Sequence, residues 1–286
     1  MYKMNEPKLS FAQFGEDMIL DAILCKIKEP IFYIDVGANH PIILSVTYWF
    51  YLNGASGINI DPLPSMFDEL QKFRGRDINL RCACGAASGE LELFVHGGTD
   101  DGATLVDKFA LSDKSIAVPV RRLDDIYSEY AAGKTVHFCK IDVEGFERQV
   151  LEGLDFNVFR PYVFCMESTV PGSMIPNHAE FEHILLDNGY EFIGQHSINR
   201  YYADKNQMSK LNAGAHVFDL KNNPHYVFKC FFQEDIAKLD DKPAQDSRTK
   251  KIRIKLFGFI PLLTIKKQTN KCWLRLFGFI PLIKIK

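Results

Sequence analysis

The sequence lacks the long apolar runs that membrane-spanning and secreted chains carry. No window reaches about 18 consecutive apolar residues, so no membrane-spanning helix is predicted. Residues 1–10 are polar and do not contain the apolar core of a signal peptide. We therefore expect a cytoplasmic protein, which can still bind peripherally at the inner face of a membrane.

Cysteine and histidine occur without the spacings that metal sites and disulfide frameworks use. The seven cysteines include no CxxC pair, and Cys82 and Cys84 fit alternate positions of a strand. The eight histidines are scattered, and no HExxH motif occurs. We expect buried, reduced thiols and no dedicated zinc site.

The net charge of −2 hides a strong asymmetry along the chain. Residues 248–286 contain 11 Lys or Arg and no Asp or Glu. Residues 1–247 therefore hold 23 of the 34 basic residues and all 36 acidic ones. The sequence thus combines an acidic body with a basic C-terminal segment.

The basic segment is a tandem repeat. Residues 251–266 (KIRIKLFGFIPLLTIK) match residues 271–286 (KCWLRLFGFIPLIKIK), and LFGFIPL is identical in both. Basic and apolar residues alternate at the start of each unit, and a glycine and a proline follow. This pattern predicts a small β-hairpin in each unit.

We divide the chain into a folded domain at 1–232, a charged linker at 233–250 and the repeat at 251–286. Basic residues around an apolar core favour peripheral docking of the repeat to a membrane or to glycan machinery. Docking to a partner protein or to the acidic body of the same chain is the alternative. Nucleic acid is the weakest alternative, because only charge supports it.

Strand-like and helix-like segments alternate through the body of the chain. This alternation predicts an α/β fold with a mostly parallel central sheet flanked by crossover helices. Strands are expected at 31–36, 57–60, 78–84, 90–96, 116–121, 136–141, 162–167, 190–195, 199–203 and 214–219. Helices are expected at 15–28, up to residue 52, and at 63–74, 123–130, 145–153 and 179–188.

The first strand ends in the turn Asp35-Val-Gly37-Ala38-Asn39, where glycine lets the backbone approach a ligand closely. The turn lacks the full GxGxxG pattern and the lysine of a P-loop. A glycine turn without a phosphate cradle suits a ligand with an adenosine but no phosphate, such as S-adenosylmethionine. A purely structural turn is the alternative.

Carboxylates follow two further predicted strands, and ligands of open parallel sheets bind beyond such strand ends. Asp61 could accept hydrogen bonds from both hydroxyls of a ribose, or cap the helix that follows Pro62. Asp142 and Glu144 could act as a general base, as metal ligands or as a clamp for the amino-acid end of the cofactor, with helix capping as the alternative. Glu147 is expected to face solvent.

Together these segments resemble the FkbM-type family of S-adenosylmethionine-dependent methyltransferases. The resemblance covers roughly 10–220 and rests on QFGED (13–17), IDVGAN (34–39), GINIDP (57–62), KIDVEG (140–145) with Glu147, VFCME (163–167) and INRY (198–201). It implies a Rossmann-like methyltransferase fold and O-methylation, often of sugars or glycan-linked products. Family members often have Gly at the position of Pro41, which still fits the first turn of a helix.

The resemblance implies that the cofactor lies over Asp35, Gly37, Asn39 and Asp61. Together with the motifs, it leads to a wider set of expected site residues. Asp142 and Glu144 would be catalytic, as a base or through a divalent cation. Asn199 and Arg200 would hold the acceptor, with a surface ion pair as the alternative for Arg200. Residues 100–104 would form either a lid or a plain surface loop. The cofactor would contact Glu16, Asp35, Gly37, Ala38, Asn39, Asp61 and Asp142.

The leading hypothesis is an S-adenosylmethionine-dependent O-methyltransferase of polysaccharide biosynthesis, which methylates a sugar hydroxyl of a glycan or a glycan-linked product. One alternative keeps the enzyme and changes the acceptor to a lipid, a polyketide-like compound or a protein. Another is a non-catalytic methyltransferase-like module that docks glycan machinery.

Overall fold

The computed structural model describes residues 8–95, 104–106 and 115–220, and also gives the backbone of the strands at 226–228, 251–256, 260–268, 271–276 and 283–285. The predicted linker at 233–250 lies outside the described residues. Two compact units, Met1–Gln233 and Glu234–Lys286, make up the chain, and each is described by itself.

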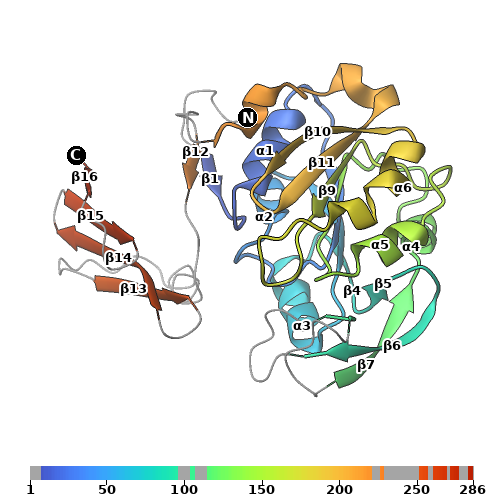
Figure 1. Cartoon of the computed structure of the whole chain (residues 1–286), viewed down its shortest axis with the longest axis horizontal. Coiled ribbons are helices and arrows are strands. Elements are labelled where there is room, and N and C mark those ends of the chain that lie inside the picture. The colour runs from blue at the N-terminus through green and yellow to red at the C-terminus, as the bar shows by residue number, and fades with distance from the viewer. Residues whose placement is uncertain are drawn as a thin grey trace. The chain divides into compact units, whose positions relative to one another are not determined.

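A seven-stranded sheet forms the centre of the first unit, in the order β10-β11-β9-β8-β2-β3-β4 (Figure 1). Six of the seven strands run in the same direction, and β11 runs antiparallel to its neighbours β9 and β10. The prediction of an α/β fold with a mostly parallel sheet is therefore confirmed. The strands are β2 (Phe32–Val36), β3 (Ser56–Ile60), β4 (Ile78–Leu80), β8 (Phe138–Ile141), β9 (Val163–Glu167), β10 (Tyr190–His196) and β11 (Asn199–Asp204).

Helices cover both faces of this sheet (Figure 1). One face packs on α4 (Leu123–Tyr130), α5 (Glu147–Glu152) and α6 (Glu182–Asp187). The other carries α1 (Glu16–Ile23), α2 (Tyr48–Leu52) and α3 (Pro64–Phe73). Short 3₁₀ helices follow at η2 (His178–Glu180), η3 (Lys205–Lys210) and η4 (Ala215–Phe218).

The two faces of β2 differ in chemistry although all five of its residues are buried. Ile34 and Val36 belong to the main apolar core, which also includes Leu123 of α4 and Val150 of α5. Tyr33 and Asp35, which alternate with them, lie on the opposite face. That face carries a buried polar network next to aromatic side chains such as Phe138, which stacks on Tyr33, and it is the face that leads to the site.

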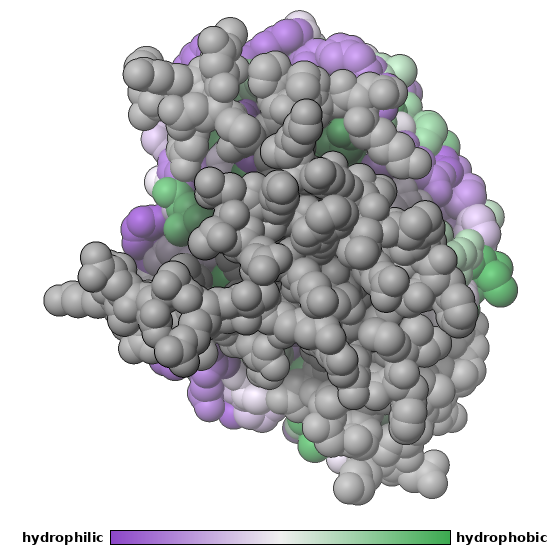
Figure 2. All heavy atoms as spheres, turned by 90° about the vertical axis from the view of Figure 1, so that its left-hand side faces the viewer, coloured by the Kyte–Doolittle hydropathy of each residue, from purple (hydrophilic) through white to green (hydrophobic). Residues whose placement is uncertain are grey.

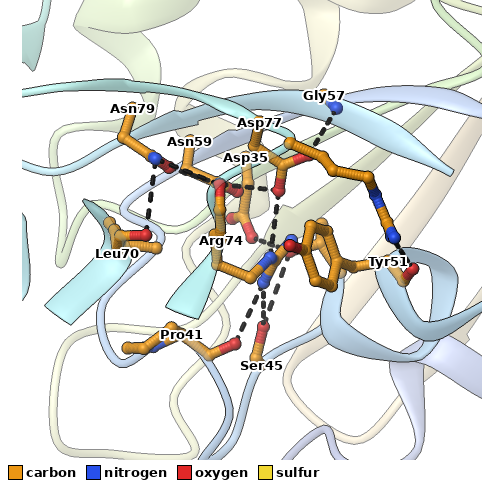
Figure 3. A network of polar contacts seen from close by, with 12 residues as sticks. Asp35, Pro41, Ser45, Tyr51, Gly57, Asn59, Leu70, Arg74, Asp77 and Asn79 are labelled. Carbon is orange, nitrogen blue, oxygen red and sulfur yellow. Dashed lines mark hydrogen bonds and ion pairs between the residues drawn. The ribbon is translucent and has the colours of Figure 1, made fainter. Parts of the chain in front are cut away.

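Arg74, which directly follows α3, is the centre of this buried polar network (Figure 3). Its guanidinium is fully buried and donates to Asp77 Oδ2 at 2.9 Å, to the carbonyl of Pro41 at 3.0 Å and to the Tyr33 hydroxyl at 2.6 Å. It also donates to Thr47 Oγ1 at 3.0 Å. The network therefore ties the chain that follows β2 to the helix layer.

Two predicted strands are corrected. The segment expected at 78–84 breaks into β4 and β5 (Ala83–Cys84), and β5 belongs to a separate sheet with order β5-β7-β6. That sheet also contains β6 (Gly89–Phe94) and β7 (Ser115–Arg121). The strand expected at 214–219 is wrong, because the chain forms the 3₁₀ helix η4 there. An additional parallel pair joins β1 (Lys8–Ser10) to β12 (Tyr226–Phe228).

The second unit contains a four-stranded antiparallel sheet with the order β13-β14-β15-β16. Each sequence repeat contributes one antiparallel pair, β13 with β14 and β15 with β16, as the repeat predicts. The strands are β13 (Lys251–Leu256), β14 (Ile260–Gln268), β15 (Lys271–Leu276) and β16 (Ile283–Ile285).

The described surface shows mainly hydrophilic residues broken by small hydrophobic spots on the face seen in Figure 2. Exposed large apolar residues include Met174, Ile175 and Phe192. No helix in the described part of the chain is long and apolar enough to cross a membrane.

Candidate active site

The sheet register brings several predicted site residues into one row. Val36 of β2 pairs with Ile60 of β3 and with Ile141 of β8, and Ile141 pairs with Met166 of β9. Parallel strands present their carboxyl ends at the same edge, so the residues that follow these four also lie side by side. Across β3, β2, β8, β9 and β11, the row reads Asp61, Gly37, Asp142, Glu167 and Asn199.

Gly37 begins a tight turn directly against the end of β8. Its φ of +76° and that of Asn39, +50°, are both left-handed. A Cβ at position 37 would lie 1.8 Å from the backbone oxygen of Asp142. Glycine is therefore required for space as well as for conformation. The amides of Gly37 and Ala38 donate to the carbonyl of Ile60 at 3.0 and 3.1 Å, which joins the turn to β3.

Asp61 links the turns that follow β2 and β3. Its Oδ2 accepts the amide of Asn39 at 2.8 Å, and its Oδ1 accepts the amide of Leu63 at 3.0 Å. The second bond is a local turn contact to the residue that precedes α3, and the N-terminus of α3 has no side-chain cap, so Asp61 does not cap this helix. Both oxygens keep further lone pairs. Burial raises the pKa of Asp61 to about 6.

Lys140 of β8 is buried beneath the glycine turn. Its Nζ donates to the carbonyl of Gly37 at 2.6 Å and lies 3.5 Å from Asp35 Oδ1 and 3.3 Å from Asp142 Oδ2. Burial alone would lower the pKa of Lys140, but the carboxylates of Asp142 and Asp35 outweigh it and raise the pKa. Asp35 also accepts a hydrogen bond from Thr47 Oγ1 at 2.8 Å. Asp35 thus helps to hold Lys140, whose ammonium group binds the carbonyl of Gly37 in the turn.

Three carboxylates converge beyond β8 and β9. One oxygen each of Asp142, Glu144 and Glu167 lies within 4.8 Å of the others. Burial, followed by the charges of Asp142 and Glu147, raises the pKa of Glu144 to about 7. Burial and the charge of Asp142 also raise the pKa of Glu167 strongly. Glu167 is absent from the predicted site residues, although it ends a predicted strand in the same register as Asp142.

The loop between β8 and α5 has a strained backbone that several contacts hold. Glu144 has a φ of +51°, an uncommon conformation for a residue other than glycine. Thr104 Oγ1 donates to the carbonyl of Glu144 at 2.7 Å. Thr104 thus contacts the site, whereas residues 100–103 of the predicted lid lie outside the described residues.

Glu147 is not solvent-facing, and that expectation is wrong. Only 2% of the residue is exposed, and its Oε1 accepts the amides of Val143 at 3.0 Å and Gly145 at 3.1 Å. Burial raises its pKa to about 7. The residue holds the loop that carries Glu144, because it satisfies two backbone donors just before α5.

Glu16 and Asn199, 183 positions apart, are in direct contact. The Asn199 side-chain amide donates to Glu16 Oε1 at 2.7 Å, and the backbone amide of Phe14 donates to Glu16 Oε2 at 2.8 Å. Burial raises the pKa of Glu16 to about 7. The residues that were expected to hold the cofactor and the acceptor thus pair with each other at the β11 end of the row.

Arg200 lies on the opposite face of the sheet from Asn199, because neighbouring residues of a strand alternate. Its guanidinium pairs with Glu182 of α6 at 2.6 Å and stacks 4.0 Å from the ring centre of Phe192. This is the ion pair that the sequence left as the alternative. The structure does not bring Arg200 together with the carboxylate row, and we assign it no acceptor role.

A comparison with protein-family models matches residues 35–192 to the methyltransferase FkbM domain. The chain belongs to the FkbM methyltransferase family. The match spans more than half of the 286 residues and includes Gly37, Asp61, Asp142 and Glu167. A search of curated proteins finds no significant match.

An FkbM methyltransferase domain implies S-adenosylmethionine-dependent methyl transfer, so the protein is a methyltransferase with this cofactor and a Rossmann-like fold. The residues present fit that cofactor. Asp61 retains lone pairs for ribose hydroxyls at the end of β3, beside a turn at Gly37 that only glycine can form. Negatively charged side chains at Asp142 and Glu144 suit a cofactor that carries a positive sulfur and an ammonium group.

Proposed function

We propose that this FkbM methyltransferase methylates a hydroxyl oxygen, and that the acceptor is a sugar of a glycan or a glycan-linked product. The observation that carries the proposal is the position of Asp142 and Glu144 beside the glycine turn, at the carboxyl edge of the sheet. A hydroxyl must lose its proton to become a good nucleophile. Carboxylates at this edge can accept that proton and also hydrogen-bond to neighbouring hydroxyls of a sugar.

S-adenosylmethionine, when bound, supplies a methyl group on a positively charged sulfur. The chain's own residues then have two tasks. The turn at Gly37 and the Asp61 carboxylate hold the adenosine end, and alignment of the two reactants can contribute about 7–11 kcal/mol to lowering the barrier. Glu144, with a pKa of about 7, takes the proton of the hydroxyl as the oxygen–methyl bond forms.

The test is mass spectrometry of surface glycans from cells with and without the gene, followed by transfer in vitro with the full chain. We expect a mass difference of one CH₂ group on a sugar, and a much lower rate with Asp142→Asn and with Glu144→Gln. Glu180→Gln, at an exposed glutamate in η2, is the matched control. Methylation of only a lipid, polyketide-like or protein fraction would replace the sugar acceptor. Transfer at the full rate by both site variants would show that neither Asp142 nor Glu144 is the general base.

We further propose that the repeat docks the enzyme to an anionic membrane surface. The register of the small sheet supports this, because apolar positions align across all four strands: Ile252 with Ile265, Leu274 and Ile283. Lys251 aligns with Lys266, Trp273 and Lys284 in the adjacent row. A sheet in which an apolar row of paired positions lies beside a largely basic row combines interfacial burial with attraction to anionic lipid. Docking to a protein is the alternative.

A further inference from the structure

The carboxylates of Asp142, Glu144 and Glu167 form a cluster at the carboxyl ends of β8 and β9. We propose that this cluster binds a divalent cation of the oxygen-preferring class, which includes Mg²⁺, Mn²⁺ and Ca²⁺. The role of the cation in catalysis rests on the proposed function. Its binding does not, because it can be measured without cofactor or acceptor.

The geometry fits such a cation. The three ligand oxygens lie within 4.8 Å of one another. Oxygens on opposite sides of a cation, at bond lengths of about 2.1–2.4 Å, are about 4.2–4.8 Å apart. The carboxylates are therefore already at the outer limit of one coordination shell. Small rotations of the half-buried Glu144 side chain would bring all three oxygens within bonding distance of one cation.

Glu167 is the second, independent observation. It is 94% buried, since its exposed fraction is 6%, and its Oε2 has no hydrogen-bond partner. A buried carboxylate oxygen that accepts no hydrogen bond is costly, because it loses water and gains nothing in exchange. Since one oxygen of this carboxylate lies within 4.8 Å of ligand oxygens of Asp142 and Glu144, the side chain is aimed into the cluster.

No basic side chain in the described part of the chain compensates the cluster fully. Lys140 lies 3.3 Å from Asp142, but it also donates to the Gly37 carbonyl and pairs with Asp35. No ion pair joins Glu144 or Glu167 to a Lys, Arg or His among the described residues. A divalent cation would supply the missing positive charge, and oxygen donors of this kind select hard cations over zinc or copper.

The position of the cluster also suggests a catalytic role for the cation. It lies in the row between the glycine turn and Asn199, at the edge where the proposed function places the acceptor hydroxyl. A cation there would hold the hydroxyl oxygen and lower the pKa of the hydroxyl. The competing arrangement is a proton that Glu167 shares with Asp142 and that leaves no place for a cation.

The experiment is Mn²⁺ binding to the full chain, followed by electron paramagnetic resonance and calorimetry, with Mg²⁺ and Ca²⁺ as competitors. We expect one saturable Mn²⁺ site that either competitor displaces. Glu167→Gln, which keeps the side-chain shape, should weaken binding at least ten-fold, and Glu180→Gln should leave it unchanged. Glu144→Gln should also weaken binding, and it decides the matter if circular dichroism shows that Glu167→Gln does not fold.

Absence of saturable binding, or equal affinity in wild type, Glu167→Gln and Glu144→Gln, would overturn the site in favour of a shared proton. The outcome is separable from the proposed function. Mn²⁺ binding without transfer to any hydroxyl would leave the site standing and remove the proposed acceptor chemistry. Full transfer in the presence of chelator, without Mn²⁺ binding, would remove the cation site and leave the proposed acceptor chemistry standing.

Discussion

At the residue scale, Asp61 joins two loops and keeps part of its hydrogen-bonding capacity. Its carboxylate accepts the amides of Asn39 and Leu63, which fixes its position at the edge of β3. Burial raises its pKa to about 6, so it changes charge within an accessible pH range. Because only the ionised form accepts hydrogen bonds through both oxygens, cofactor binding should depend on pH.

We predict that affinity for S-adenosylhomocysteine falls as the pH is lowered through about 6, because Asp61 then takes up a proton. Asp61→Asn should weaken binding about 10- to 150-fold at neutral pH, since hydrogen bonds to a charged group contribute about 1.5–3 kcal/mol. The variant should also lose most of the pH dependence. Calorimetry at several pH values measures both effects, and an unchanged affinity in Asp61→Asn would exclude the ribose role.

Gly37 provides a second test at this scale. An alanine there combines a left-handed backbone with a Cβ 1.8 Å from the Asp142 oxygen, whereas at Gly133, with φ +78°, nothing lies within 4 Å of the added Cβ. Gly133→Ala should lower the free energy of unfolding only through backbone strain, by about 1–2 kcal/mol. Gly37→Ala should cost about 1–3 kcal/mol more, because the turn and the end of β8 must separate. Urea unfolding compares the two, and equal losses would contradict the close approach.

At the scale of elements, Arg74 connects the end of α3 to the polar face of the sheet (Figure 3). Its partners include Asp77 and the carbonyl of Pro41, just beyond the glycine turn. Asp77 in turn accepts the amide of Gly57 at 2.9 Å, so the network reaches β3. One buried ion pair thus joins α3, the segment after the glycine turn and β3.

We predict that Arg74→Met lowers the free energy of unfolding by about 3–5 kcal/mol, because it leaves Asp77 buried without its cation. Adding Asp77→Asn to this variant should recover part of the loss. Arg148→Met is the matched control, since Arg148 forms a half-exposed pair with Glu152 and should matter by about 0.5 kcal/mol or less. A small loss in Arg74→Met, measured by urea unfolding, would show that the network contributes little to stability.

At the scale of the whole molecule, charge and structure divide the chain in similar places. The acidic body contains the methyltransferase fold, and the basic repeat forms its own antiparallel sheet. The site residues described above all belong to the first unit. Cofactor binding and surface docking should therefore be separable functions.

We predict that the full chain floats with anionic vesicles and not with neutral ones, and that salt weakens the association. A chain that ends at residue 247 should not float, but it should bind S-adenosylhomocysteine with unchanged affinity. Equal flotation of the two chains would contradict membrane docking by the repeat. A loss of cofactor affinity on truncation would show that the two units are coupled.

Local patterns in the sequence identify most elements of the fold. Apolar spacing predicts α4 at Leu123–Tyr130 with the observed bounds. The residues that end β2, β3 and β8 are likewise visible, because strand, glycine and carboxylate follow one another directly in the chain. The segments at 78–84 and 214–219 are not predicted correctly, since their local patterns do not reveal which sheet, if any, they join.

What the sequence by itself determined is the family, the class of fold and the motifs at Gly37, Asp61 and Asp142. Only the tertiary structure decided that Glu167 completes the carboxylate cluster, that Glu147 is buried and that Arg200 lies on the other face from Asn199. The physical reason is the distance along the chain over which each feature is set. Helix periodicity and strand alternation arise from neighbouring residues, whereas burial and register depend on pairings between β8, β9 and β11 across long stretches of chain.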